Sequence, residues 1–313
     1  MPRVESENTL FHYMQQHFTG RSRNNLKGLL ARGQVMVDGK SVTKFDYPLS
    51  PGQLVEILKD APQPRRKMPF PIIYEDAQLV VTNKPCGLLA VSSDTEKDRT
   101  AYHMLTAAMY GELETLTKYS MRRPTGRLHV VHRLDRDTSG LLIFAKSEEI
   151  KDVLQNNWDK MVFRRGYLAV VEGRVTLDEG RVHSWLKQNQ ALVMYSSKTP
   201  GNGQEAITDY KVLRRSKDYS LVELSLMTGR KNQIRVHMKE LGHPIAGDKK
   251  YGAQRDPIKR MALHAFALTL THPVTGETIA LETPCPAEFE KMFAEKKPSD
   301  RPQSKPKKPT KLR

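Results

Sequence analysis

Apolar side chains follow a helical period near the start of the chain. Between residues 10 and 18 they recur at the spacing of one helix face, which predicts a helix with Asn8 or Thr9 as its cap. A leucine-rich run predicts a second helix that begins after Ser22 and ends at Gly33. The chain therefore begins with two short amphipathic helices.

Short strand-like runs follow these helices. In QVMVDGKSV the Asp38-Gly39 pair separates two such runs, which is the strongest local signal for a two-residue hairpin turn, and residues 53–58 read as another strand. The segment APQPRRKMP is rich in proline and basic residues and is typical of a linker. We assign residues 1–60 to a small αα-β module and 61–70 to a linker.

Beyond the linker, strand signals alternate irregularly with a few helices. This order favours an α+β domain over residues 71–295, with a mixed, largely antiparallel sheet and flanking helices, rather than a regular βαβ series. The predicted helices lie near residues 100–111, 147–160, 232–241 and 287–296. The segment 296–313 is polar and rich in proline, so we expect a disordered basic tail.

The charge of the chain favours a polyanionic partner. The formal net charge is +16 and the sequence pI is about 9.7, which attracts nucleic acid before any specific contact forms. The alternative is a basic tail on an ordinary domain. The tail carries eight basic residues and one aspartate, or seven of the sixteen charges, so most of the bias lies elsewhere.

Several kinds of site are not suggested by the sequence. The two cysteines, Cys86 and Cys285, are far apart and form no CxxC motif, so we expect a reducing cytoplasm and neither a disulfide framework nor structural zinc. The histidines lack partners at metal-ligand spacing, and no glycine-rich phosphate loop follows a strand. No apolar run approaches the roughly 18 residues of a membrane span, so we expect no membrane contact.

The run HVVHRLDRDTSGLLIFAK carries the strongest candidate chemistry. It places several charged side chains, from His132 to Asp137, in a polar turn immediately before an apolar strand that begins at Leu141. Side chains at such a strand entrance face either solvent or a cleft. The residues alone leave both readings open.

The sequence of this run and the sequences of three others resemble those of the RluA-type pseudouridine synthases. HRLDRDTSG matches that family's HRLD, two variable residues and TSG, while YEDAQLVVTNKPCGLLAV, RRGYLAVVEG and TGRKNQIRVHMKELGHPIAGDKKYG resemble three further family blocks in the same order. The four blocks span about 180 residues. The related RsuA branch has glycine where this chain has His132, so the resemblance is to the RluA branch.

The resemblance implies an isomerase that converts uridines in RNA to pseudouridines without a cofactor. It implies that Asp135 is the catalytic aspartate, Tyr167 the active-site tyrosine and Arg235 the arginine paired with the aspartate. It also implies that Arg133 enters the RNA duplex during base flipping. Asn232 stands where the family often has histidine, which puts a proton-transfer role for that position in doubt.

The chemistry explains these residue types. Asp135 can attack the ribosyl carbon, stabilise an oxocarbenium-like centre or remove a ribose proton, and the sequence leaves these three routes open. Arg235 would keep that carboxylate ionised in a dry site. A planar Arg133 suits the gap left by a flipped base, with His132 and Arg136 as further RNA contacts.

The N-terminal module also resembles a known RNA-binding element. SRNNLKGLLARGQVMVDGK is similar to the alpha-L RNA-binding motif. Its second helix would present Arg21, Arg23, Lys27 and Arg32 to an RNA backbone.

We therefore expect a monomeric, cytoplasmic pseudouridine synthase. Large-subunit ribosomal RNA is the first candidate substrate, because related synthases with this module often act on the ribosome, and transfer RNA is the second. A non-catalytic RNA chaperone or ribosome-assembly factor is the alternative from another class.

Overall fold

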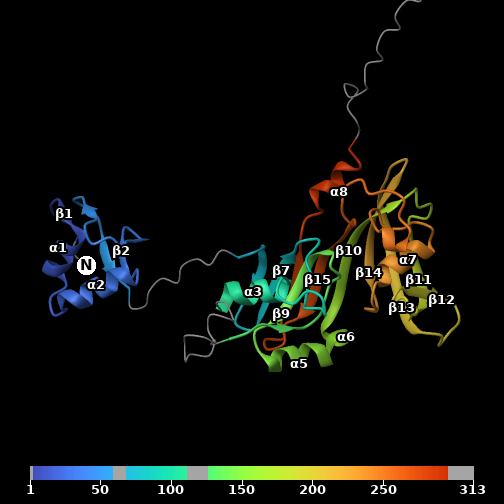
Figure 1. Ribbon diagram of the computed structural model, residues 1–313, viewed down its shortest axis with the longest axis horizontal. Helices are drawn as coiled ribbons and strands as arrows, with labels where there is room; N and C mark the ends of the chain where they lie inside the picture. The colour runs from blue at the N-terminus through green and yellow to red at the C-terminus, as the bar shows by residue number, and fades with distance from the viewer. Residues whose placement is uncertain (1–2, 59–67, 111–125, 295–313) are drawn as a thin grey trace, which may run out of the picture. The chain divides into compact units, whose positions relative to one another are not determined.

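The chain folds as two compact units, Met1–Lys67 and Met68–Arg313. The computed structural model describes residues 3–58, 68–110 and 126–294, and Figure 1 shows both units. Most of the predicted linker and the whole predicted basic tail, 296–313, lie outside the described residues. No helix in the described ranges is long and apolar enough to cross a membrane.

The first unit contains the two predicted helices, α1 (Leu10–His17) and α2 (Arg23–Ala31). Ser22 caps α2, since its side chain accepts a hydrogen bond from the Asn25 amide at 3.2 Å. The short strands of this unit are β1 (Asn8–Thr9), β2 (Val35–Val37), β3 (Lys40–Ser41), β4 (Pro48–Leu49) and β5 (Val55–Ile57). Asp38 and Gly39 form the predicted β2–β3 turn, with φ angles of 47° and 74°.

The second unit is built on one 11-stranded sheet. Its strands are β6 (Ile72–Glu75), β7 (Leu79–Lys84), β8 (His129–Val130), β9 (Ser139–Ala145), β10 (Val162–Glu172), β11 (Glu179–Gln188), β12 (Met194–Ser197), β13 (Gln204–Arg215), β14 (Tyr219–Leu226), β15 (Leu263–Thr271) and β16 (Thr278–Glu282). The main path runs β12-β11-β13-β14-β10-β15-β9-β7-β6. Every pair in it is antiparallel except β15 with β9, so the predicted α+β class with a mixed, largely antiparallel sheet is confirmed.

Helices cover both faces of the sheet (Figure 1). They are α3 (Ala101–Tyr110), α5 (Glu148–Asn156), α6 (Trp158–Met161), α7 (Gln233–Glu240), α8 (Ala287–Lys291) and the 3-10 turn η1 (Lys249–Tyr251). Leu105 of α3 packs in a cluster with Val80, and Leu154 of α5 packs in another with Val81. Because neighbouring residues of a strand point to opposite faces, α3 and α5 lie on opposite sides of β7.

One glycine lets the parallel pair of β9 with β15 form. Gly140 of β9 lies opposite Ala265 of β15 and has a φ of 117°. A Cβ atom added to it would lie 2.1 Å from the Ala265 carbonyl oxygen, so no other residue fits there. Ala265 also pairs with Tyr167 of β10. This close approach brings the turn before β9, which carries Asp135, beside the strand that carries Tyr167.

Candidate active site

A pocket of about 310 Å³ lies where this turn, β10 and α7 meet. It is lined by residues 133–135 and 138, by Tyr167, and by residues 229–235. Four predicted site residues therefore meet in one cavity, although they come from segments up to a hundred residues apart in sequence.

Asp135 presents its carboxylate to this pocket from the polar turn. The turn is closed by the Thr138 amide, which donates to the Asp135 carbonyl at 3.2 Å. The Oδ2 atom of Asp135 accepts hydrogen bonds from Asn232 Nδ2 at 2.5 Å and from Arg235 Nη1 at 3.3 Å. Oδ1 has no hydrogen-bond partner among the described residues.

Arg235, on α7, is the partner cation that the sequence predicts. Its side chain is 12% exposed, and it donates two hydrogen bonds to Asp248, from Nε at 2.7 Å and from Nη2 at 2.8 Å. The Tyr251 ring lies beneath the guanidinium, 4.7 Å from ring centroid to Cζ. Burial acts to lower the pKa of Arg235, but Asp248 and Asp135 outweigh it and raise this pKa above its ordinary value. Arg235 is therefore a permanent cation fixed in one orientation.

Asn232 is a site residue whose contact the sequence reasoning missed. It precedes α7 in the left-handed conformation, with φ 54° and ψ 22°, which asparagine tolerates better than most residues. Its Oδ1 accepts a hydrogen bond from the Tyr251 hydroxyl at 3.1 Å, which orients Nδ2 toward Asp135. Asn232 thus acts as a second donor to the carboxylate.

Asp248 and Tyr251 were also missed as site residues. Both belong to the segment GDKKYG, which closes the fourth family block, and that segment was the available signal. Neither residue lies at a helical or strand spacing from Asp135, so no periodicity could connect them.

Tyr167 lies in the pocket wall with no hydrogen-bond partner for its hydroxyl among the described residues. Burial raises the pKa of Tyr167 to about 12, and the Asp135 charge adds to the rise while Arg165 opposes it. The hydroxyl is therefore a proton donor at neutral pH and not a ready base.

Of the other residues of the polar turn, two arginines are exposed and one histidine packs against the protein. Arg133 and Arg136 are exposed, and Arg133 lines the pocket. His132 instead faces the protein: its Nε2 accepts the Ile143 amide at 3.2 Å and its ring packs on Trp158. Burial lowers the pKa of His132 to about 4. These contacts differ from the RNA contact expected for His132, because the ring face and Nε2 are already occupied.

Lys84 binds the backbone of the polar turn through its side chain. Its ammonium is fully buried and donates to the carbonyls of Arg136, Leu88 and Pro85 at 3.1, 2.8 and 2.9 Å. Burial lowers the pKa of Lys84 to about 8. The asparagine-lysine-proline segment therefore fixes the backbone next to Asp135.

The predicted basic residues of the first unit are all exposed. Arg23 lies over the Phe11 ring at 5.7 Å, and Arg32 Nε donates to Gln34 Oε1 at 2.6 Å. Arg21 and Lys27 form no ion pair within the described ranges. Across those same ranges, no group of three or more His, Cys, Asp or Glu side chains is arranged to hold a metal ion.

Comparison with known proteins shows which family this part of the chain resembles. A family model described as RNA pseudouridylate synthase matches residues 78–240, the stretch that carries Asp135, Tyr167 and Arg235. The uncharacterized RNA pseudouridine synthase YlyB of Bacillus subtilis is 34% identical over 281 residues, which cover 87% of this chain and 88% of that protein.

Two further similarities extend this picture. The ribosomal large subunit pseudouridine synthase D of Vibrio cholerae is 31% identical over 294 residues, covering 88% of this chain and 87% of that protein. The solved structure of human RNA pseudouridylate synthase domain containing 1 superposes with a TM-score of 0.55 at 26% identity, covering 71% of this chain and 85% of that one.

Proposed function

Because the chain belongs to the RNA pseudouridylate synthase family, we propose that its pocket isomerises specific uridines of large-subunit ribosomal RNA, with Asp135 as the catalytic carboxylate. Membership of the family makes the protein an isomerase that converts uridine in RNA to pseudouridine. One observation carries the assignment of Asp135: its carboxylate meets Arg235 in a pocket that also holds Tyr167.

The reaction breaks the bond between N1 of uracil and C1′ of ribose and forms a bond between C5 and C1′. The proton on C5 leaves, and N1 takes up a proton, so no second substrate is needed. In this scheme Asn232 and Arg235 hold Oδ2 of Asp135, and Oδ1 acts on the ribose. It does so by attack on C1′, by stabilising positive charge there or by removing a ribose proton.

Tyr167 has a supporting role in this scheme. Its ring packs against the flipped uracil, and its protonated hydroxyl donates a hydrogen bond inside the pocket. The pKa of about 12 supports this role over removal of the C5 proton by a phenolate, because almost no phenolate exists at neutral pH. Arg133, exposed at the pocket wall, occupies the gap that the base leaves in its stack.

The choice of ribosomal RNA rests on the names of relatives. Four of them, from two strains of Neisseria meningitidis, from Vibrio cholerae and from Pasteurella multocida, are called ribosomal large subunit pseudouridine synthase D at 31–33% identity. Transfer RNA is the second candidate substrate. In the first unit, Arg21, Arg23, Lys27 and Arg32 are the proposed contacts to the RNA backbone. We also propose a monomeric, cytoplasmic enzyme, in keeping with its two free cysteines.

Mapping of pseudouridine in total RNA, with and without the gene, tests the substrate. Loss of a defined site in large-subunit ribosomal RNA is the expected result. Loss of a transfer-RNA site would select the second substrate, and no lost site would favour a non-catalytic RNA chaperone.

Asp135→Asn tests the catalytic carboxylate. The purified variant should lose at least about 10³-fold in turnover, since it removes the group that starts the reaction, while RNA affinity and melting temperature stay near those of the wild type. Asp137→Asn is the matched control, because Asp137 lies in the same turn with an exposed side chain. Comparable turnover in the two variants would remove Asp135 from its role.

A further inference from the structure

Two arginines at or next to the pocket lining form no ion pair with any described carboxylate. Arg165, on β10, donates from Nη2 to the Met227 carbonyl at 3.0 Å. Arg230, in the loop after β14, donates from Nε to the Glu205 carbonyl at 2.9 Å. Neither guanidinium forms an ion pair with any residue that the structure describes. Each is therefore held in place by main chain while its remaining N–H groups are left for another partner.

The neighbouring arginine on the same strand, Arg164, does form ion pairs. Arg164 precedes Arg165 on the same strand and pairs with Glu282 at 2.6 Å and with Glu223 at 3.4 Å. A strand alternates its side chains between the two faces of the sheet, so Arg164 and Arg165 point to opposite sides. Arg165, which approaches Gly229 of the pocket lining, is the one of the two that forms no ion pair with a described carboxylate.

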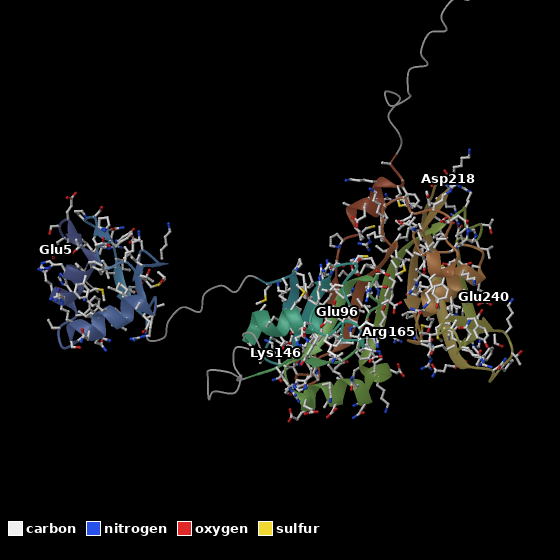
Figure 2. The ribbon with its side chains drawn as sticks, in the orientation of Figure 1. Glu5, Glu96, Lys146, Arg165, Asp218 and Glu240 are labelled. Carbon is white, nitrogen blue, oxygen red and sulfur yellow. The ribbon has the colours of Figure 1, made fainter. Side chains whose placement is uncertain are left out.

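The loop after β14 connects the two arginines, because it carries Arg230 and its Met227 carbonyl accepts from Arg165. Arg165 Nη1 lies against Gly229, where an added Cβ atom would come within 2.9 Å of it. Gly229 and Arg230 both line the pocket that contains Asp135 and Tyr167. Arg165 is labelled in Figure 2, between the part of the sheet covered by α5 and the part next to α7. Arg230 thus lines the pocket itself, and the Arg165 guanidinium lies directly behind Gly229 of its lining.

Electrostatics at this position favour an anion. Burial lowers the pKa of Arg165 and the charge of Arg230 acts in the same direction, whereas Tyr167 and Asp159 oppose the shift. Two like charges that influence each other, neither of them in an ion pair with a described carboxylate, disfavour the empty site. The planar fork of arginine matches the oxygens of a phosphate, which two such forks can bind together.

We propose that Arg165 and Arg230 bind a phosphate group that flanks the target uridine, fixing the ribose while the base occupies the pocket. This proposal rests on the proposed function. A nucleotide whose base enters the pocket leaves its own two phosphates at the edge, within the reach of side chains that line it. Binding one of them would position the ribosyl carbon against Oδ1 of Asp135.

The test uses RNA oligonucleotides that contain the mapped target uridine. One carries ordinary phosphates, and two others carry a single uncharged methylphosphonate on the 5′ or the 3′ side of that uridine. Wild-type enzyme should lose about tenfold or more in single-turnover kcat/KM with one of the two neutral linkages, the size expected for a charge-assisted contact. Arg165→Gln and Arg230→Gln should each lose a similar factor on ordinary RNA and be much less sensitive to the same neutral linkage.

Two further variants separate this contact from general effects. Arg181→Gln removes an exposed arginine that pairs with Asp209, so it should keep the full sensitivity of the wild type. Gly229→Ala should move only the Arg165 guanidinium, because the nearest atom to the new Cβ is the end of that flexible side chain. It should therefore reproduce part of the Arg165→Gln effect in a folded enzyme, which melting curves would verify.

Three outcomes would overturn the proposal. If the arginine variants slow the reaction but stay as sensitive to the neutral linkage as wild type, the arginines act elsewhere, for instance on Tyr167. If wild-type enzyme modifies all three oligonucleotides equally, no phosphate contact exists, although the proposed function stands. If wild-type enzyme modifies no uridine in any RNA, both proposals fail together.

Discussion

At the scale of single residues, the central feature is a carboxylate held by donors that the chain folds toward it from far away. Asp135 and Arg235 are a hundred positions apart, and their pairing could be predicted only because the surrounding runs resemble a known family. Asn232 and Asp248, which hold this pair in place, were not predicted. Their roles depend on side-chain orientation at a helix start and in a turn, and neither the helical nor the strand period encodes that orientation.

Asp248→Asn tests whether Asp248 holds Arg235 in place beside Asp135. The change removes the charge that holds Arg235 in place, so the guanidinium is left half-paired in a buried site. We expect a loss of about 3 kcal/mol in unfolding free energy and a fall of about tenfold or more in kcat, with KM changed less. Denaturant titration and steady-state kinetics measure the two effects.

The control for this variant is Asp209→Asn, which breaks an exposed bidentate pair with Arg181. Exposed pairs contribute about 0–1 kcal/mol, so this variant should remain close to wild type in both measurements. Equal effects of the two substitutions would show that Asp248 does not orient the active site.

At the scale of elements, local sequence patterns predicted individual helices and strands. They did not predict which strands, distant in sequence, pair with each other. The helix predicted over 100–111 is α3, whereas the one predicted over 147–160 is two helices that break at Asn157. The parallel pairing of β9 with β15 joins segments about 125 residues apart. Its only sequence signal was Gly140, which also fits an ordinary turn.

Gly140→Ala tests the importance of that close approach. The new methyl group would overlap the Ala265 carbonyl in a backbone conformation that L-residues rarely adopt, so β9 and β15 must separate. We expect a loss of about 3 kcal/mol or more in unfolding free energy, read from denaturant titration. Gly276→Ala is the matched control, because Gly276 also has a positive φ but has no atom within 4 Å of the added Cβ. Gly276→Ala should lower the unfolding free energy by about 1 kcal/mol. If Gly140→Ala lowers it by no more than this, the close approach of β9 to β15 does not have the role given to it.

At the scale of the whole molecule, buried neutral histidines link folding of the second unit to pH. Burial lowers the pKa of both His237 and His264 to about 4, and hydroxyl partners surround each ring. The unfolded chain takes up these protons below about pH 6.5, whereas the folded chain does so only near pH 4. Stability is therefore fully present above about pH 6.5 and falls as the pH drops toward 4.

Each of these two histidines should contribute up to about 1.4 kcal/mol per pH unit to the slope of this loss, and His132, whose pKa burial also lowers to about 4, should contribute in the same direction. His264→Gln keeps polar atoms near its two hydroxyl partners but removes one titrating group, so the slope in that window should fall by about one proton. His12→Gln, in the first unit, leaves the sheet unchanged and serves as control. Denaturant titrations across the pH window measure the slope, and identical slopes in wild type and His264→Gln would contradict the linkage.

The excess positive charge of the molecule also makes a prediction about the first unit. Arg21 and Lys27 are exposed and take part in no ion pair within the described residues, so they can be changed with little effect on folding. If they contact the RNA backbone, replacing both by glutamine removes up to two phosphate contacts. The slope of log K against log salt should then flatten by about 1.4–1.8.

Because these two side chains lie outside the unit that carries Asp135, the saturating turnover rate and the choice of uridine should stay the same. Filter binding over a range of salt concentrations, together with pseudouridine mapping, measures both. Lys40→Gln with Lys44→Gln removes the same charge from exposed positions near the hairpin and should flatten the slope less. Equal flattening in both double variants would mean that the unit attracts RNA only through its overall charge. A changed target uridine would mean that the first unit helps to select the site as well as to bind RNA.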